Sequence, residues 1–420
     1  MSVATTTSTT TITTNTTSIN DDFVTMDTWE SIELNGNLLD LRKTLLSGQC
    51  FRWRRLNIDG QQQQQQQYGP DDCWAGPLDH HLVILRKVND QLQYKFIDEL
   101  RRINNDNGQF NQQSRSQRIS DYFNLGHNLT SLCKQWATGD HSLNKQFATV
   151  CTGFEGLRLL RQSPLECLFS FICSQNNHIS RITNMVQSLS KFGPIITSHA
   201  GVDFHRFPSL DQLVQIQQKQ LDDLGFGYRS KFIVKAAQQV QEKGGDQWLL
   251  SLRTQSHEVA QQQLTSLMGV GQKVADCVCL FSLDKLDIVP IDTHIFTISK
   301  KHMPSLAKKT LTPKIYQDIR MFWKERFGDH AGWGHTILFA NEIAEFKQSN
   351  GVQGAAKGGK RGKSAKSNKA SNKKRSQDDD DEEDDEEEEE EAEDAPDEAP
   401  KSSISSITGR TRRATKKARS

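Results

Sequence analysis

The fold is decided by HEVAQQQLTSLMGVGQKVADCVCLFSLD, residues 257–284, which predicts two helices joined by a very short turn. Apolar residues recur at spacings of three and four up to Leu267 and again from Gln272, as on one face of a helix. The turn MGVG at 268–271 contains two glycines, which permit positive φ and a close approach of another backbone. The second helix then points its unpaired amides and the positive end of its dipole at whatever fills the gap, and a phosphate suits that place.

This helix-hairpin-helix carries Lys273 in the first turn of its second helix. The helix dipole disfavours a cation there, and the residues four and seven positions further on, Cys277 and Leu280, are apolar. Both effects favour the neutral, nucleophilic amine. The alternative is an ordinary solvated lysine, beside a turn that only lets two helices pack.

The candidate partner of Lys273 is Asp292, in VPIDTHIF at 289–296. Pro290 ends any preceding helix, and the aspartate comes directly before a helical stretch at 293–301, so N-capping alone would explain it. A capping carboxylate can also stabilise the oxocarbenium-like sugar that forms when a glycosidic bond breaks. The two residues together therefore predict a nucleophile with a charge-stabilising carboxylate.

Upstream of the helices, short segments between Leu38 and Phe96 are rich in aromatic or branched residues and are separated by Gly, Asp or Asn. They predict the strands of a small antiparallel sheet. The segments are LLDLRKTLL, QCFRWRR, CWAGPLDHHLVILRK and QLQYKF. The Gln run at 61–67 lies between two of them and predicts a hairpin extension without regular structure.

From Ile119 onward the spacing of apolar residues changes to three and four, and the stretch 130–348 is predicted to be all-helical. We therefore expect an α+β fold, with an antiparallel β-sheet domain at 26–128 packed on a helical helix-hairpin-helix domain at 129–349.

Both ends of the chain are predicted to be disordered. Residues 1–25 are rich in Thr and Ser, and residues 350–420 alternate between basic, acidic and basic blocks. The chain has 52 Lys plus Arg and 52 Asp plus Glu, and residues 351–420 hold 16 and 18 of these. The remainder is nearly neutral, so any contact with nucleic acid has to be local. The tail itself predicts either a solvated spacer or a segment for nuclear import and weak chromatin contacts.

Several classes of protein are disfavoured by the composition. No run approaches the 18 or so apolar residues of a membrane span, and the first residues suit neither a secretory signal nor an arginine-rich transit peptide. The eight cysteines lack a disulfide rhythm, which indicates a reducing compartment. Only Cys277 and Cys279 are close in sequence, so a zinc or iron–sulfur site built on local spacing is not expected.

Read together, LMGVGQKVADCVCL and VPIDTHIF resemble the helix-hairpin-helix glycosylases whose signature ends in a Gly/Pro-rich loop and an aspartate. The resemblance is specifically to the eukaryotic 8-oxoguanine DNA glycosylases with lyase activity at apurinic or apyrimidinic (AP) sites, and it extends from Trp29 to Asn341. Further matching segments are SGQCFRW at 47–53, RLLRQSPLECLFSFICSQNNHISRI at 158–182, LGFGYRSKFI at 224–233 and HAGWGHTILF at 330–339.

The resemblance implies base excision repair by an enzyme that needs no cofactor and acts on duplex DNA. The tail favours the nucleus, with a mitochondrial fraction left open, and the sequence offers no reason to expect more than a monomer. The substrates of this enzyme would be 8-oxoguanine opposite cytosine and formamidopyrimidine purines. Lys273 would attack C1′ to form a Schiff base, Asp292 would support bond cleavage, and β-elimination would nick the strand. Gly48 would accept the N7–H that 8-oxoguanine has and guanine lacks. From the residues alone, Gly48 is only a turn before a strand.

The remaining site residues are implied in the same way. Cys277 and Phe339 would sandwich the extruded base, with Pro290 lining the pocket, although an aromatic residue in a helix is usually core. An extruded base leaves the opposite cytosine without its partner and a gap in the base stack. Hydrogen-bond donors would face the cytosine, namely Asn176, Arg181 and Arg229, and the ring of Tyr228 would wedge into the gap. The phosphate would be held by His294 and by the amides of Gly269, Val270 and Gly271, with an optional structural cation on the hairpin carbonyls.

The sequence departs from the family pattern at three positions. His335 stands where a glutamine that reads the Watson–Crick edge of the base is expected, and neutral imidazole offers only one donor and one acceptor. We therefore expect base recognition to weaken below about pH 6. Met268 replaces the usual hairpin proline and Phe281 a methionine, and both substitutions predict repacking only.

Three other interpretations remain open at this point. An endonuclease III or adenine glycosylase would bring a four-cysteine cluster after the aspartate, and no cysteine follows Cys279. A non-catalytic helix-hairpin-helix protein that uses its tail as a chromatin adaptor would leave Lys273 and Asp292 unexplained. A histone-binding protein with a degenerate enzyme core would lose its function with the tail, whereas a glycosylase would retain excision in residues 25–350.

Overall fold

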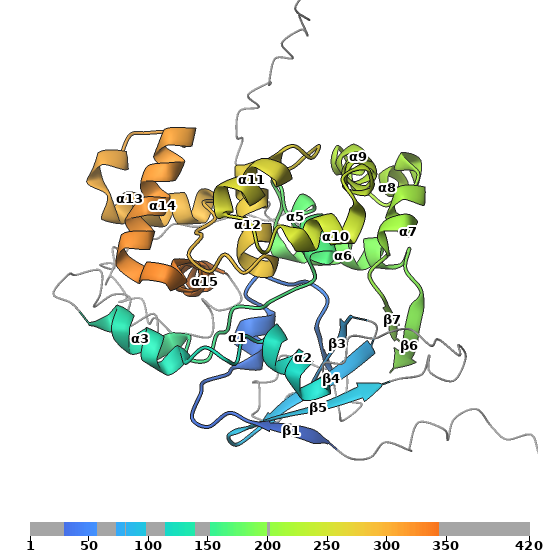
Figure 1. The fold of residues 1–420 in the computed structure, drawn as a ribbon, viewed down its shortest axis with the longest axis horizontal. Coiled ribbons are helices and arrows are strands. Elements are labelled where there is room, and N and C mark those ends of the chain that lie inside the picture. The colour runs from blue at the N-terminus through green and yellow to red at the C-terminus, as the bar shows by residue number, and fades with distance from the viewer. Residues whose placement is uncertain are drawn as a thin grey trace, which may run out of the picture. The chain divides into compact units, whose positions relative to one another are not determined.

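The computed structural model describes residues 29–56, 73–79, 81–97, 114–138, 152–199 and 202–343. Its N-terminal part is an antiparallel sheet, and most of the remainder is helical (Figure 1). The expected α+β class is thus confirmed. The predicted tails and the Gln run lie outside the described residues.

The sheet has five strands in the order β1-β5-β4-β3-β2, with every neighbouring pair antiparallel. The strands are β1 (Glu30–Glu33), β2 (Arg54–Leu56), β3 (Cys73–Leu78), β4 (His81–Val88) and β5 (Gln91–Ile97). Side chains alternate along β5, where Leu92, Tyr94 and Phe96 are buried between partly exposed neighbours. Their buried face packs against Ile119 of helix α2 (Arg115–Tyr122).

One predicted strand is wrong, because LLDLRKTLL forms helix α1 (Leu41–Leu45). Asp40 caps this helix, and its side chain accepts a hydrogen bond from the Lys43 N–H at 2.9 Å. An N-cap supplies a partner for an otherwise unpaired amide of the first turn, and here this local signal outweighs the β-like composition. Strand β1 lies before the segment in which strands were expected.

The helical part extends to Glu342. Its helices are α3 (Leu129–Ala137), α5 (Pro164–Ile172), α6 (Ile179–Ser190), α7 (Leu210–Gln215), α8 (Gln218–Asp223), α9 (Arg229–Glu242), α10 (Gly245–Ser251), α11 (His257–Thr265), α12 (Gln272–Ser282), α13 (Thr293–His302), η3 (Pro304–Leu306), α14 (Pro313–Phe327), η4 (Gly328–His330) and α15 (Ala331–Glu342). The stretch 130–348 is not purely helical, because the hairpin β6 (Ile195–His199) and β7 (Val202–His205) lies within it. Phe204 of this hairpin packs with Ala75 and Leu82 of the main sheet.

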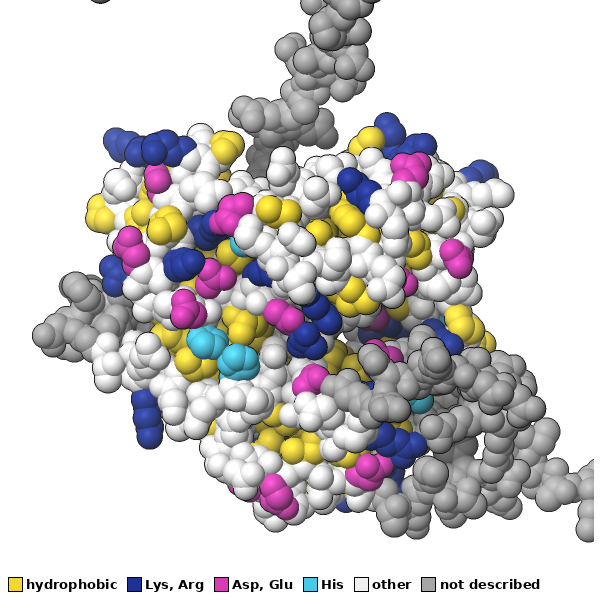
Figure 2. Space-filling view, in the orientation of Figure 1, with side chains coloured by type: hydrophobic (Ala, Val, Ile, Leu, Met, Phe, Trp, Pro, Cys, Tyr) yellow, Lys and Arg dark blue, Asp and Glu magenta, His cyan; other side chains and the backbone are white. Residues whose placement is uncertain are grey.

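The surface carries charges of both signs. Figure 2 shows Lys and Arg side chains interspersed with Asp and Glu over the described part of one face. This pattern agrees with the nearly neutral composition before residue 351.

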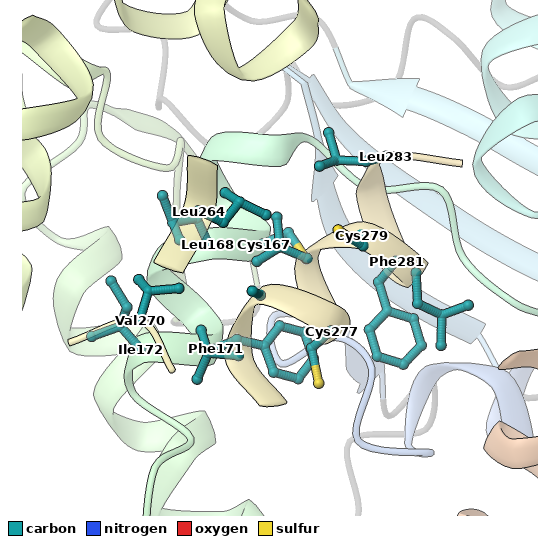
Figure 3. Close-up of a cluster of buried hydrophobic side chains, with 14 of the residues drawn as sticks. Cys167, Leu168, Phe171, Ile172, Leu264, Val270, Cys277, Cys279, Phe281 and Leu283 are labelled. Atoms are coloured by element: carbon teal, nitrogen blue, oxygen red, sulfur yellow. The ribbon is translucent and has the colours of Figure 1, made fainter. Parts of the chain in front are cut away.

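The main core forms where α12 crosses α5 (Figure 3). Cys277 and Phe281 of α12 lie beside Phe171 of α5, and the rings of Phe171 and Phe281 stack with centroids 5.4 Å apart. Stacked aromatic pairs add stabilisation beyond the apolar area that they bury. Phe281, which departs from the family pattern, is therefore a core residue, on the same helix that carries Lys273.

The segments beside three helices meet at the fully buried Arg158. Its guanidinium donates to the Asn37 side chain and to the backbone carbonyls of Leu38, Phe123, Asn124 and His127. Burial lowers the pKa of Arg158 to about 10, so the side chain remains charged at neutral pH. A buried charge is tolerated when it is fully hydrogen-bonded, and this one joins the segments that flank α1, α2 and α3.

Replacing Arg158 by methionine is expected to lower the free energy of unfolding by about 3–5 kcal/mol, because the buried carbonyls lose their donors. Urea unfolding followed by circular dichroism measures this loss. The matched control is Arg161→Met, since Arg161 pairs with Asp284 at 2.6 Å but is about one third exposed. We expect the control to lose less than about 1 kcal/mol, and equal losses in the two variants would contradict the assigned role of Arg158.

Candidate active site

Lys273 lies at the start of α12, two residues after the N-cap Gly271. Its Nζ is 3.4 Å from Ser174 Oγ and 5.4 Å from the centre of the Phe171 ring. These contacts hold the end of the side chain over the C-terminal end of α5. Lys273 is partly buried, and the neighbours predicted to desolvate it, Cys277 and Leu280, are both buried.

Asp292 caps α13, and its Oδ1 accepts a hydrogen bond from the Ile295 N–H at 2.8 Å. The capping interpretation is therefore correct for one carboxylate oxygen. Asp292 is only partly buried, and its charge acts together with that of Lys273 on both Cys277 and His335. The candidate nucleophile Lys273 and the carboxylate of Asp292 therefore lie near the same two side chains.

The two groups that feel both charges are kept neutral by burial. Burial raises the pKa of the Cys277 thiol to about 12, which the Lys273 charge opposes. Burial also lowers the pKa of His335 to about 4, which the charge of Asp292 opposes and that of Lys273 reinforces. At neutral pH the site therefore has a thiol and a neutral imidazole, beside Lys273 and Asp292.

His335 is 6% exposed, and its Nδ1 has no hydrogen-bond partner among the described residues. The carbonyls of Gly332 and Pro290 lie near the ring and favour its charged form, but neither reaches Nδ1 with normal hydrogen-bond geometry. An unpaired buried polar atom is costly, so a ligand that bonds to Nδ1 would recover that cost.

Phe339 joins the helical part of the site to the segment between α1 and β2. Its ring stacks with that of His335 at 6.3 Å and meets the His294 ring edge-on at 5.8 Å. Gly48 lies on its other side with φ +78°, and a Cβ on Gly48 would be 3.1 Å from Phe339 Cε1 and 3.3 Å from Ile179 Cδ1. Three of the residues predicted to hold the base, Gly48, Phe339 and His335, are therefore neighbours, and the backbone of a fourth, Pro290, lies near His335.

The hairpin turn has the positive φ that its glycines predicted, and the group that packs closely on it is a side chain. Gly269 has φ +75°, and a Cβ there would lie 2.4 Å from Cγ of Phe232. Gly271 is exposed, with nothing within 4 Å of where its Cβ would be, whereas Val270 is buried and anchors the turn. This arrangement leaves the N-terminus of α12 open to a phosphate.

The DNA-facing candidates occupy a second region, next to the hairpin. Tyr228 is 51% exposed, and Asn176 and Arg181 are exposed as well. Arg229 is almost fully buried instead, and it donates to the backbone carbonyls of Gln175 and Asn176. Arg229 thus orders the turn that carries Asn176, in addition to the base contact predicted for it.

Sequence reasoning missed Gln175, which joins these two regions. Its Nε2 donates to the Gly269 carbonyl at 2.9 Å, while its own carbonyl accepts from Tyr228 Oη at 3.3 Å and from Arg229 Nε at 3.1 Å. Ser174 and Phe171, which touch Lys273, were also missed. All three lie in the matching segment at 158–182, but nothing in their spacing marks them.

Two family models match the chain. The model of the 8-oxoguanine DNA glycosylase N-terminal domain matches residues 31–168, and that of HhH-GPD superfamily base excision DNA repair proteins matches residues 169–325. The N-glycosylase/DNA lyase OGG1 of Arabidopsis thaliana is 35% identical over 320 residues, which cover 75% of this chain and 80% of the relative. The chain belongs to the 8-oxoguanine DNA glycosylase/lyase family.

Other members agree with this assignment. The N-glycosylase/DNA lyase of Saccharomyces cerevisiae is 33% identical over 343 residues, which cover 74% of this chain and 85% of that protein. The 8-oxoguanine glycosylase/lyase of Clostridium acetobutylicum, solved with double-stranded DNA containing cytosine opposite 8-oxoguanine, is similar with a TM-score of 0.59. It is 25% identical and covers 77% of this chain and 99% of its own. The protein is therefore a DNA repair glycosylase with AP lyase activity, which neither non-catalytic interpretation predicts.

In the part of the chain that the structure describes, no three His, Cys, Asp or Glu side chains gather as a metal site would require. None of the helices there is long and apolar enough to cross a membrane.

The variant Gly48→Ala is expected to excise the target base more slowly, because its new methyl group would press on the Phe339 ring. The alanine would also have to keep the left-handed backbone conformation of Gly48. The control is Gly36→Ala, which has the same kind of backbone, φ +71°, but nothing within 4 Å of its Cβ. Both variants should lose about 1–2 kcal/mol of stability. Single-turnover excision should fall only in Gly48→Ala, and equal rates in the two variants would contradict the packing of Gly48 on Phe339.

The pKa of His335 predicts a change in stability with pH. The folded protein favours the neutral form of His335. The free energy of unfolding therefore has its full value above about pH 6.5 and decreases as the pH falls towards 4. Between pH 7 and pH 4.5 the unmodified enzyme should lose about 2–3 kcal/mol more than His335→Gln. Urea unfolding at the two pH values measures the difference, and parallel losses would be inconsistent with a buried neutral imidazole.

The same pKa corrects the sequence-based expectation of weaker base recognition below about pH 6. Burial moves the protonation of His335 to about pH 4. Single-turnover excision at pH 5.5 relative to pH 7 should therefore be the same in the unmodified enzyme and in His335→Gln. A selective loss in the unmodified enzyme at pH 5.5 would restore the earlier expectation.

Proposed function

We propose that this enzyme excises 8-oxoguanine, and formamidopyrimidine purines, from duplex DNA opposite cytosine and then cleaves the strand through a lysine Schiff base. The observation that carries the proposal is the placement of Lys273 in the first turn of α12 and of Asp292 at the N-cap of α13, with the buried Cys277 and His335 near both. The solved relative from Clostridium acetobutylicum, bound to DNA with cytosine opposite 8-oxoguanine, supports the substrate.

In the proposed mechanism the amine of Lys273, once it has lost its proton, attacks C1′ while the N-glycosidic bond breaks and the base departs with the bonding electrons. The carboxylate of Asp292 stabilises the positive charge that develops on the sugar. The C1′–O4′ bond then breaks as the nitrogen lone pair forms the C=N bond, and one amine proton passes to O4′, which gives the protonated Schiff base and an open sugar. β-Elimination then removes a C2′ proton and expels the 3′-phosphate.

The base pocket would bind the extruded purine between Cys277 and Phe339. The Cys277 thiol is neutral and buried, and the Phe339 ring is fixed by Gly48 and His335, so both walls suit a flat aromatic ring. The Gly48 carbonyl would accept the N7–H of 8-oxoguanine, while Nδ1 of His335 offers an unused polar atom for the other edge.

Extrusion costs a few kcal/mol and leaves a gap in the duplex. The exposed ring of Tyr228 is suited to fill that gap, and it is braced by Arg229, whose guanidinium lies 4.4 Å from the ring centre. Asn176 and Arg181 would donate to the opposite cytosine. The amides of Gly269 and Gly271, together with His294, would hold the flanking phosphate. The third predicted amide, that of Val270, already donates to the Leu267 carbonyl at 3.1 Å.

The enzyme is further proposed to act in the nucleus as a monomer. The basic blocks at 357–375 and 410–419 support nuclear import and contacts with chromatin or repair proteins. Fusing residues 350–420 to a fluorescent protein should be sufficient for nuclear accumulation, and uniform fluorescence would contradict this role of the tail.

Borohydride trapping on duplex DNA with one 8-oxoguanine opposite each base in turn tests the mechanism. Borohydride reduces the imine to a stable amine, so the unmodified enzyme should form a covalent adduct, fastest opposite cytosine. Lys273→Gln should form none. The matched control is Lys219→Gln, which removes an exposed lysine paired with Asp223 and should trap normally.

Two results would overturn the proposal. An adduct of normal yield with Lys273→Gln would assign the nucleophile elsewhere. Trapping that is equally fast opposite all four bases, or on undamaged guanine, would contradict the substrate.

A further inference from the structure

A buried polar network connects the helix that carries Lys273 to the loop that carries Asp292. Its centre is Asp276 of α12, which is fully buried. Oδ2 of Asp276 accepts a hydrogen bond from Tyr316 Oη of α14 at 2.8 Å. The same Oη accepts a hydrogen bond from the backbone N–H of Ile291 at 3.1 Å, directly before Asp292.

The other oxygen of Asp276 binds the first helix of the hairpin. Oδ1 accepts from Gln261 Nε2 at 2.6 Å and pairs with His257 Nε2 at 2.8 Å, both on α11. Because a carboxylate oxygen is an acceptor, Nε2 of His257 carries the proton. One carboxylate therefore ties α11, α12 and α14 together.

Tyr316 has the right chemistry for its place in this network. The residue is 4% exposed, and its hydroxyl has one proton to donate and lone pairs to accept. The proton goes to Asp276 and a lone pair takes the Ile291 N–H, so the direction of each hydrogen bond is fixed. Phenylalanine would fill the same space but could make neither bond.

The loop between α12 and α13 is held at its two ends by different helices. Near its start, the Leu286 carbonyl accepts from the Gly332 N–H of α15 at 2.9 Å. Near its end, the Ile291 N–H is held by Tyr316. Asp292 follows Ile291 directly. The hydrogen bond from Ile291 to Tyr316 therefore holds the backbone just before Asp292 in place relative to α12.

We propose that Tyr316 and Asp276 are positioning residues that set the separation between the Lys273 amine and the Asp292 carboxylate. The inference rests on the proposed function, in which these two groups act on one sugar. A misplacement of about 1 Å can lower a rate about 100-fold, so a fixed link between the two segments matters more for the rate than for DNA binding.

The direct test is single-turnover excision of 8-oxoguanine by Tyr316→Phe, with DNA affinity measured in parallel. We expect the rate constant to fall about 10- to 100-fold and the Kd to change less than about twofold. The matched control is Tyr94→Phe, which removes a buried hydroxyl bonded to Glu30 at 3.0 Å in the sheet and should leave the rate unchanged. A rate in Tyr316→Phe equal to that of the control would overturn the proposal.

Non-additivity separates positioning from a loss of structure. Asp292→Asn keeps an effective N-cap but removes the charge. If Tyr316 acts through Asp292, then adding Tyr316→Phe to Asp292→Asn should slow the reaction less than about threefold further. A full additional loss in the double variant would show a merely structural role and reject the inference.

The two proposals fail in different ways. An Asp292→Asn enzyme as fast as the unmodified enzyme would remove the proposed role of Asp292, and with it that of Tyr316. A slow Asp292→Asn enzyme beside a fast Tyr316→Phe enzyme would leave the mechanism intact and reject the positioning role alone.

Discussion

The crossing of α12 on α5 is the contact on which the rest of the site depends. One side of α12 buries Cys277 and Phe281 against Phe171. The same contact holds the Lys273 amine over the end of α5. A displacement of this crossing would move the proposed nucleophile Lys273, the proposed pocket residue Cys277 and the hairpin turn together, because the first two lie on α12 and the turn leads directly into it.

Burial has two uses in this site. It stabilises the fold by removing apolar surface from water, and it also determines which groups carry charge. The pKa of Cys277 rises and that of His335 falls, so both stay neutral at physiological pH for the same physical reason. In the proposed mechanism the carboxylate of Asp292 stabilises the cationic sugar, and the neutral His335 adds no positive charge that would oppose it.

The sequence predicted the features that depend on local signals. The hairpin, the start of α12 and the cap at Asp292 follow from glycines, a proline and helical periodicity within a few residues. The contacts of Lys273 with Ser174, Gln175 with Gly269 and Tyr316 with Asp276 join residues 99, 94 and 40 positions apart, which no periodicity reveals. Helix α1 was mistaken for a strand because its apolar composition obscured the Asp40 cap, and the effect of burial on His335 required the packed structure.

Peptide mapping of the borohydride-reduced DNA adduct by mass spectrometry tests the central claim most directly. A tryptic peptide in which Lys273 carries the reduced deoxyribose remnant is the result that this account predicts. A remnant on the N-terminal amine or on another lysine would contradict it, because the contact between α12 and α5 would then position a residue that does not form the covalent bond.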